Sequence, residues 1–234
     1  MVDNEVTELN LLGENKPVEL LKFIIASGGV NISCDSIISS LWPDADGDHA
    51  KNSLDTTIHK LRGILKNKSA LTLTNGIVSI NKALCNLDSC AFKELISELN
   101  SLNDKNISFD EAMRFKSRLL NIYKGPAFLM SKEAPWIYGY QIKTKSAFLR
   151  AVMTLGARFE AMKELGRAAN IYAAALEHHP ISEEICTKLI KLRISQGLNC
   201  EAMSTFEEYR VSLKNFMGTK PSHALQNMIN ELNR

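Results

Sequence analysis

The stretch "LWPDADGDHAKNSLDTTIHKLRGIL", residues 41–65, places three aspartates at alternate positions directly before a basic amphipathic segment. A calcium loop that began at the first aspartate would need glycine at its sixth position and glutamate at its twelfth, where this chain has His49 and Asp55. A turn before a helix explains the pattern better, because Pro43 cannot continue a preceding helix and Asp48 is a natural N-cap. The stretch therefore predicts a helix from Asp48, without a metal site.

The predicted helix after residue 48 carries one apolar stripe. Its members recur at intervals of four, three and four residues, which is the spacing of a single helix face. Gly63 weakens the last turns without overturning the prediction. The stripe consists of Leu54, Ile58, Leu61 and Leu65.

Two shorter helices and a hairpin surround this long helix. "KPVELLKFIIASGG" (16–29) has apolar residues at helical spacing and ends on two glycines, and "ISCDSIISSLWP" (32–43) opens with Ser33 as an N-cap. "ALTLTNGIVSIN" (70–81) is rich in strand-forming residues around Asn75-Gly76, a strong signal of a two-residue hairpin turn. The order helix, helix, longer helix, hairpin is that of a winged helix.

The long helix also carries polar side chains suited to DNA. Small hydroxyl groups let a helix approach base edges closely, and lysine can reach guanine acceptors. Arginine and asparagine hold phosphates and set register. A solvated helix face is the alternative explanation of the same pattern. The residues predicted to contact DNA are Ser53, Thr56, Thr57 and Lys60 at the bases, Asn52, His59 and Arg62 at the phosphates, and Thr74 and Asn75 at the hairpin tip.

Composition narrows the class of protein. With 234 residues, 45% of them hydrophobic and 23% charged, the chain can bury a core in one or two domains. Its apolar runs are far too short for a membrane span and its start is acidic where a signal peptide is basic, so we expect a cytoplasmic protein without membrane contact. Five cysteines at irregular spacing predict reduced thiols, with no zinc site and no cofactor.

Charge is unevenly distributed along the chain. Residues 1–90 hold 8 Lys+Arg against 11 Asp+Glu, a net charge of −3, whereas residues 91–234 hold 20 against 15, a net charge of +5. The first part lacks the bulk basicity of an avid DNA binder. Any DNA contact must therefore depend on local charge.

The chain after residue 87 is predicted to be almost wholly helical. Ala168 and Ala202 are separated by 34 residues, as are Tyr172 and Phe206. That period is typical of tetratricopeptide helix pairs, in which small residues allow close packing and an aromatic fills the gap between helices. We expect helices at roughly 89–101, 108–123, 135–164, 167–178, 182–196, 199–215 and 221–233.

Several conspicuous residues have structural interpretations. Gly166 and Gly197 are expected in the turns inside the helix pairs, and Trp136 is expected to anchor a core at the start of the long helix. His178 and His179 stand at a predicted helix end, where a cation suits the helix dipole. No nucleophile elbow, zinc-protease motif or spaced carboxylate pair occurs, so we do not expect an enzyme.

The ordered succession of segments resembles one family. The long-helix stretch and "LTNGIVSI" are followed by "LDSCAFKEL", "YKGPAFL", "PWIYGYQIK", "AANIYAAALEHHPISEEICTKLI" and "EAMSTFEEYRVSLKNFMGTKPSHAL". Together they resemble bacterial transcriptional activators of the antibiotic-regulatory-protein (SARP) type. In these proteins a winged helix of the OmpR/PhoB class is joined to a bacterial transcriptional activator domain. The likeness runs from about residue 16 to residue 232.

The resemblance implies a mainly α fold in two domains. Residues 1–86 would form a winged-helix DNA-binding domain with a small β-hairpin wing and a shortened N-terminal sheet. Residues 87–234 would form an all-α, tetratricopeptide-like activator domain. The implied function is a regulator that binds double-stranded DNA, with the helical domain mediating self-association or contacts with RNA polymerase or another protein. The sequence leaves the oligomeric state open, with a homodimer or larger assembly among the alternatives.

The match to the family's recognition helix is partial. In the family the third helix enters the major groove and the hairpin touches the minor groove or backbone. Leu61 and Arg62 match the family's "LR" directly, with Lys60 as the basic residue before them. The family's arginine near the helix start is Asn52 here, and its wing "GYR" is replaced by "IVS" at 77–79.

A second interpretation stays open. The segments "PVELLKFIIASGG" and "WPDADGD" also resemble the C-terminal regulator part of large bacterial nucleotide-binding activators. The chain would then be a degenerate winged helix with a helical-repeat protein-docking module, possibly belonging to a larger signalling ATPase-type regulator. No phosphate-binding "GxxxxGK[ST]" loop occurs in the 234 residues, so nucleotide chemistry is not assigned to them.

Overall fold

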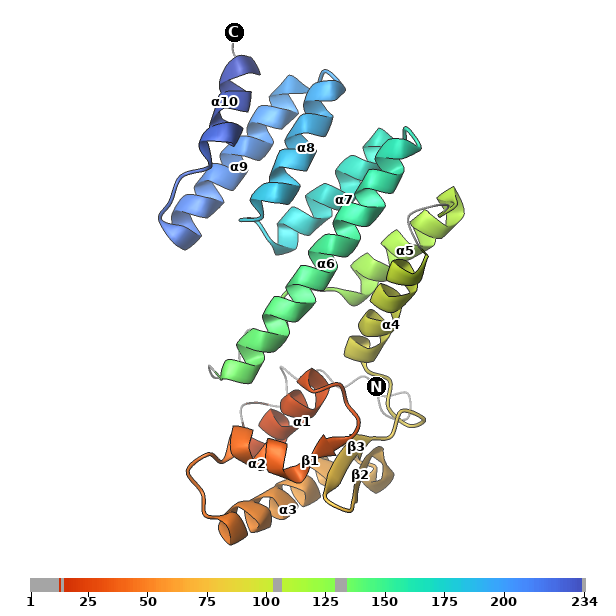
Figure 1. The fold of residues 1–234 in the computed structure, drawn as a ribbon, viewed down its shortest axis with the longest axis vertical. Coiled ribbons are helices and arrows are strands. Elements are labelled where there is room, and N and C mark those ends of the chain that lie inside the picture. The colour runs from red at the N-terminus through yellow and green to blue at the C-terminus, as the bar shows by residue number, and fades with distance from the viewer. Residues whose placement is uncertain (1–12, 14, 103–106, 129–133, 233–234) are drawn as a thin grey trace. The chain divides into compact units, whose positions relative to one another are not determined.

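The structure is a computed structural model that describes residues 13, 15–102, 107–128 and 134–232 (Figure 1). The chain divides into two compact units. Met1–Glu94 with Pro126–Thr144 forms the first, and Leu95–Gly125 with Lys145–Arg234 forms the second. The sheet expected before the first helix falls on residues 1–15, almost all of which lie outside the described residues.

The first three helices of the described chain, all in the first unit, follow one another in the predicted order. They are α1 (Lys16–Ala26), α2 (Cys34–Leu41) and α3 (Gly47–Ile64). Ser33 caps α2 as predicted, because its hydroxyl accepts a hydrogen bond from the backbone N–H of Ser36 at 3.2 Å.

The start of α3 differs from the prediction. The N-cap position belongs to Asp46, whose side chain makes no capping hydrogen bond, and the helix begins at Gly47. Asp48 therefore lies in the first turn rather than at the cap. Its carboxylate still suits the positive end of the helix dipole, so the aspartate-rich stretch favours the helix by charge rather than by capping.

A three-stranded antiparallel sheet in the order β1-β3-β2 completes the winged helix. Its strands are β1 (Ile32–Ser33), β2 (Leu71–Thr74) and β3 (Ile77–Ile80), and a single 3₁₀ turn, η2 (Lys68–Ala70), precedes β2. The predicted hairpin is confirmed: Asn75 and Gly76 both have positive φ, 50° and 73°, as a two-residue turn of type I′ requires. The sequence did not predict β1, which is only two residues long.

The predicted stripe of α3 lies in the core of this unit, where it packs with α1 and β3. Trp136, at the start of α6 (Pro135–Ala161), joins the same core, and its ring meets that of Phe23 edge-on with centroids 5.4 Å apart. The expectation that Trp136 anchors a core is confirmed. A segment distant in sequence thus completes the winged-helix core.

The remaining helices match the predicted ones within a few residues at either end. None of the helices in the described part of the chain combines the length and apolar character needed to cross a membrane. The remaining helices, which match the predicted ones, are α4 (Asp88–Ser101), α5 (Phe109–Ile122), α6, α7 (Leu165–His178), α8 (Glu183–Ser195), α9 (Asn199–Met217) and α10 (His223–Leu232).

The 34-residue period is confirmed in the second unit, since α7 and α9 begin at Leu165 and Asn199. Both repeat alanines and both repeat aromatics are buried, as tetratricopeptide-like packing requires. Gly197, with φ of 74°, lies in the turn between α8 and α9 as expected. The expectation for Gly166 is wrong: it lies inside α7, and the positive φ of that turn, 61°, belongs to Lys163.

A close approach between α6 and α7 depends on Gly156. Tyr172 lies across this glycine, and a Cβ added at Gly156 would overlap the tyrosine ring. The Tyr172 hydroxyl donates a hydrogen bond of 2.6 Å to the carboxylate of Glu160 on the same helix as Gly156. The repeat aromatic is therefore fixed both by shape and by a hydrogen bond.

Two glycines of α6 should respond oppositely to alanine. Gly156→Ala should lower the free energy of unfolding by about 1–3 kcal/mol, because overpacking displaces the Tyr172 ring. Gly139→Ala, where an added Cβ meets nothing within 4 Å, should raise it by roughly 0.5–1 kcal/mol through helix propensity. Urea unfolding followed by circular dichroism measures both. Equal effects of the two substitutions would contradict the packing described here.

A buried polar pair links α5 to the end of α7. The Tyr123 hydroxyl and Nε2 of His179 are 2.6 Å apart, and the Tyr123 ring stacks on Phe148 at 3.9 Å. Burial lowers the pKa of His179 to about 4, and the charges of Lys145 and His178 act in the same direction. His179 is therefore neutral at pH 7. The expectation of a cation at this helix end is thus wrong for His179.

The depressed pKa predicts a pH dependence of stability. Unfolded histidine binds a proton near pH 6.5, whereas folded His179 does so only near pH 4. Its contribution is complete above pH 6.5 and is lost as the pH falls toward 4, by up to about 1.4 kcal/mol per pH unit. His179→Gln should flatten this slope in urea unfolding from pH 7 to 4, and the control His223→Gln, at an exposed histidine, should keep it. A parent-like slope in His179→Gln would contradict the assignment.

Candidate nucleic-acid interface

The side of α3 opposite its core stripe forms an exposed polar row. Asn52, Thr56 and Lys60 follow one another at four-residue spacing, and all three are exposed. His59 is exposed beside them and Ser53 is half-buried. Within the described residues, no hydrogen bond or ion pair engages the side chains of Asn52, Thr56 or Lys60. This row is free to meet a partner molecule.

Thr57 does not belong to this row. Only 6% of it is exposed, and its hydroxyl donates a hydrogen bond of 2.6 Å to the Ser53 carbonyl. The reason is geometric: Thr57 lies three residues after Leu54 and four before Leu61, so it falls on the flank of the core stripe. The expectation that Thr57 faces the bases is not met in this structure.

Arg62 connects α3 to the sheet. It is half-buried, and its Nε donates a hydrogen bond of 3.1 Å to the carbonyl of Leu71 at the start of β2. Arg62 thus fixes the hairpin against the helix, while its terminal nitrogens make no hydrogen bond within the described residues. At the hairpin tip, Thr74 and Asn75 are both exposed.

Two members of the exposed row were missed by the sequence analysis. His49 precedes Asn52 by three residues and Gly63 follows Lys60 by three, so both extend the row, and both are exposed. An added Cβ at Gly63 would meet nothing within 4 Å, so the fold itself does not require glycine there. The absent side chain instead allows a partner to approach the helix backbone. The same helical period that defined the core stripe would have found both residues.

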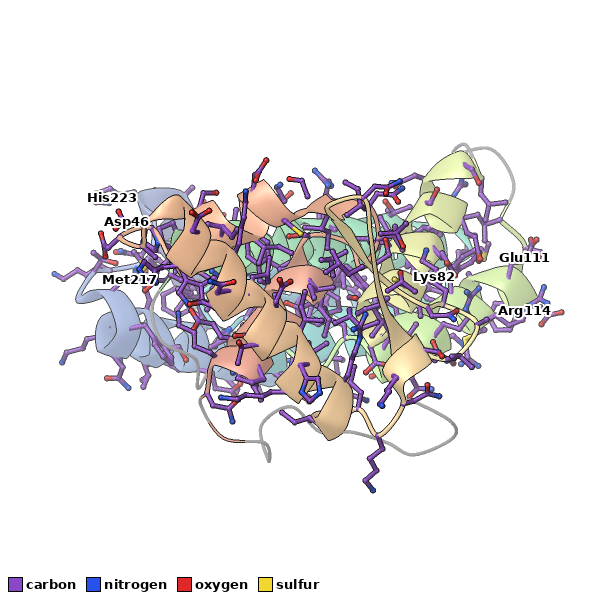
Figure 2. All side chains as sticks on the ribbon, turned by 90° about the horizontal axis from the view of Figure 1, so that it is seen from below. Asp46, Lys82, Glu111, Arg114, Met217 and His223 are labelled. Atoms are coloured by element: carbon purple, nitrogen blue, oxygen red, sulfur yellow. The ribbon has the colours of Figure 1, made fainter. Side chains whose placement is uncertain are left out.

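Acidic and basic residues are unevenly distributed along α3. Three exposed aspartates, Asp46, Asp48 and Asp55, stand at or before the middle of the helix together with the exposed Lys51, whereas its last turns carry the basic residues Lys60 and Arg62. The exposed Lys82 follows β3; Figure 2, which draws the side chains of the whole described chain, labels Asp46 and Lys82. Carboxylates repel phosphates, so phosphate contact is favoured near the later turns of α3. Within the described residues, no group of three or more His, Cys, Asp or Glu could hold a metal ion.

The fold and this surface define a class: a winged-helix regulator that also carries tetratricopeptide-like helices. The family model of the bacterial transcriptional activator domain matches residues 87–233, and the chain belongs to this family of transcriptional regulators. The resemblance to activators of the antibiotic-regulatory-protein type is thereby confirmed. Regulation of transcription is a binding function rather than a catalytic one.

Two known proteins resemble most of the chain. This chain is 24% identical over 226 residues to the regulatory protein DnrI of Streptomyces peucetius. The aligned region covers 91% of this chain and 82% of DnrI. The structure of Mycobacterium tuberculosis EmbR in complex with a low-affinity phosphopeptide matches with a TM-score of 0.63 and 16% identity. That match covers 95% of this chain but only 60% of the EmbR chain, and at this identity it shows the fold alone.

The two basic residues near the end of α3 should differ in their effect on stability. Arg62→Ala removes the hydrogen bond to Leu71 and should lower the free energy of unfolding by about 1–2 kcal/mol. Lys60→Ala changes an exposed side chain, so its free energy of unfolding should stay within about 0.5 kcal/mol of that of the parent. Thermal and urea unfolding of both variants provide the measurement. Loss of the same stability in both would show that Arg62 has no special structural role.

Proposed function

We propose that this chain is a DNA-binding transcriptional regulator whose α3 enters the major groove. The observation that carries the proposal is the exposed row on α3, whose polar side chains have no protein partner among the described residues. Residues 1–86 form the proposed DNA-binding domain, and Trp136 of the segment 126–144 packs against its core. Residues 87–234 form the proposed activator domain.

The side chains of α3 have different proposed roles. Thr56 and Lys60 contact base edges, with Ser53 at their side, since small hydroxyls and lysine match the donors and acceptors of the major groove. Asn52 and His59 contact the groove walls, together with the terminal nitrogens of Arg62. Thr74 and Asn75 at the hairpin tip touch the adjacent backbone. Thr57 supports the helix from the core side.

Binding by one copy alone is proposed to be weak. The wing carries no charge from residue 71 to residue 80, and residues 1–90 have a net charge of −3, so few phosphates can be neutralised. Pairing with a second copy would double the phosphate contacts, and the helical unit is the proposed means of self-association. RNA polymerase or another protein is its proposed further partner.

The direct test begins with selection of bound fragments from random DNA. Lys60→Ala should then weaken binding to the selected site by about 1–3 kcal/mol and relax the choice of one base pair. Titration against the selected and a scrambled duplex, at two salt concentrations, separates this effect from a general loss of charge. If the parent protein prefers no sequence among the random DNA fragments, the proposal loses its basis.

Gly63 offers a test that separates binding from stability. Gly63→Ala should stabilise the protein by roughly 0.5–1 kcal/mol through helix propensity and yet weaken DNA binding, because the new methyl group stands on the exposed row. Gly139→Ala should give a similar stabilisation without any change in binding. Binding that is unchanged in Gly63→Ala would show that α3 does not approach DNA at this turn.

The second candidate is a protein-docking module whose winged helix does not bind DNA. The exposed carboxylates at the beginning of α3 favour it, since they repel phosphates. If Lys60→Ala and Gly63→Ala both leave DNA binding unchanged while remaining folded, the exposed row is a solvated face. The docking module then becomes the better account.

A further inference from the structure

A cleft opens at the last helix hairpin of the second unit. It lies between α9, the turn that follows it, and α10, and its volume is about 440 Å³. That volume falls in the range of about 300–1,000 Å³ that small-molecule sites usually have. Its lining residues are Phe206, Arg210, Lys214, Gly218, Thr219, Lys220, Pro221, Gln226 and Asn230.

The charge of this cleft is unbalanced. Arg210, Lys214 and Lys220 line it, and none of its lining residues is acidic. Arg210 forms an ion pair of 2.7 Å with Glu207, which stands outside the lining. Lys214 and Lys220 have no ion pair with any residue that the structure describes. Two ammonium groups are thus available to a bound anion.

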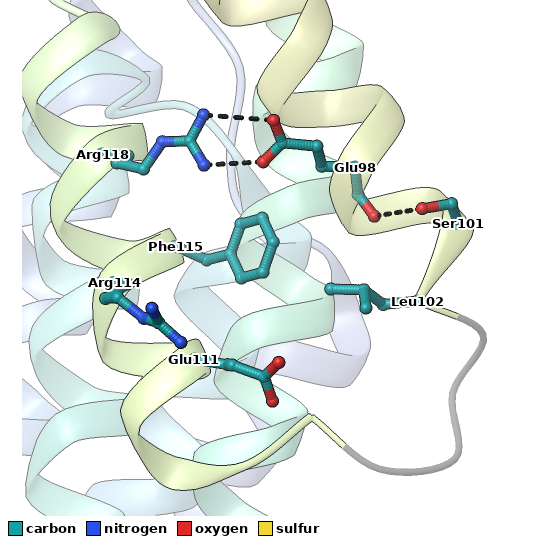
Figure 3. A pocket seen from close by; sticks show the side chains of 7 residues that line it. All are labelled: Glu98, Ser101, Leu102, Glu111, Arg114, Phe115 and Arg118. Atoms are coloured by element: carbon teal, nitrogen blue, oxygen red, sulfur yellow. Dashed lines mark hydrogen bonds and ion pairs between the residues drawn. The ribbon is translucent and has the colours of Figure 1, made fainter.

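Two other cavities of the second unit have equal numbers of acidic and basic lining residues. Figure 3 shows one between α4 and α5, where two carboxylates and two guanidinium groups face one space. There Arg118 donates to both carboxylate oxygens of Glu98, at 2.6 and 3.4 Å. A cavity between α6 and α8 likewise contains two glutamates and two lysines. Charge therefore distinguishes the α9–α10 cleft from these cavities.

The cleft also has an apolar side. Phe206 and Pro221 are buried lining residues, and Phe206 belongs to the core cluster that joins α8, α9 and α10. Gln226 and Asn230 stand one turn apart on α10 and add amide groups to the wall. A ligand could bury a flat apolar body here while its charged group stays near the lysines.

Hydrogen bonds hold the turn that closes the cleft. Gly218 ends α9 in the left-handed conformation, with φ of 65°. The Glu183 carboxylate accepts a hydrogen bond from the backbone N–H of Ser222 at 3.2 Å and one from the Tyr209 hydroxyl at 2.9 Å. The Gln226 side chain donates to the carbonyl of Pro221 at 2.7 Å. The cleft is therefore formed before any ligand binds, which reduces the entropy lost on binding.

We propose that the cleft between α9 and α10 binds a small organic anion, whose phosphate or carboxylate group is held by Lys214 and Lys220 and whose flat apolar body packs on Phe206 and Pro221. Charge-assisted hydrogen bonds from the ammonium groups supply the anion selectivity. This site goes beyond the proposed DNA contacts and does not depend on them.

The experiment uses the full chain and isothermal titration calorimetry with four probes: phenyl phosphate, phenylacetate, inorganic phosphate and phenol. We expect saturable binding of one phenyl phosphate or phenylacetate per chain at roughly millimolar affinity, as suits ligands of this size. Inorganic phosphate and phenol should bind more weakly, because each lacks half of the recognised chemistry. The better of the two aromatic anions identifies the charged group as phosphate or carboxylate.

Matched double variants locate the site. The double substitution Lys214→Gln with Lys220→Gln should lower the affinity for the aromatic anion by about tenfold or more, because two charge-assisted hydrogen bonds are lost. Lys188→Gln with Lys191→Gln removes the same charge from the cavity between α6 and α8 and should change the affinity by less than about twofold. No saturable binding of either aromatic anion, or equal weakening in the two double variants, would overturn the proposal.

Discussion

The burial of the α3 stripe fixes the orientation of everything else in the first unit. Because Leu54, Ile58 and Leu61 pack into the core with α1 and β3, the opposite side of the same helix must face solvent. Polar residues on that side need no partner within the unit. Arg62 then connects the helix to β2, so the hairpin is fixed relative to the exposed row. One hydrophobic contact surface thus determines which side chains of α3 are exposed to a partner molecule.

The long elements could be predicted from sequence because each has a strong local signal. Periodicity placed the helices, and Asn75-Gly76 placed the hairpin turn. The sequence-based predictions were wrong where packing between distant segments decides whether a residue is buried or a strand forms. Thr57 carries a hydroxyl like Thr56, yet the position of the core stripe buries it. Strand β1 is too short for any pattern, and it exists only because β3 offers its edge.

The second unit combines a simple period with specific contacts. Its repeat aromatics were visible at 34-residue spacing, but the partner of Tyr172 was not, because Gly156 lies in another helix and resembles any other glycine in the sequence. The neutral state of His179 likewise depends on burial, which the sequence of the helix end does not reveal. The cleft beside α10 arises from residues of α9, a turn and α10 that carry no motif.

The core of the first unit also bears on how the protein can be divided. The chain leaves this unit after residue 94 and returns to it for residues 126–144, where Trp136 covers Phe23. A fragment that stops at residue 86 would retain α3 and the hairpin but would expose the Phe23 ring to water. The compact unit that contains the winged helix is thus discontinuous in sequence, and it includes residues 126–144 of the region that matches the activator domain.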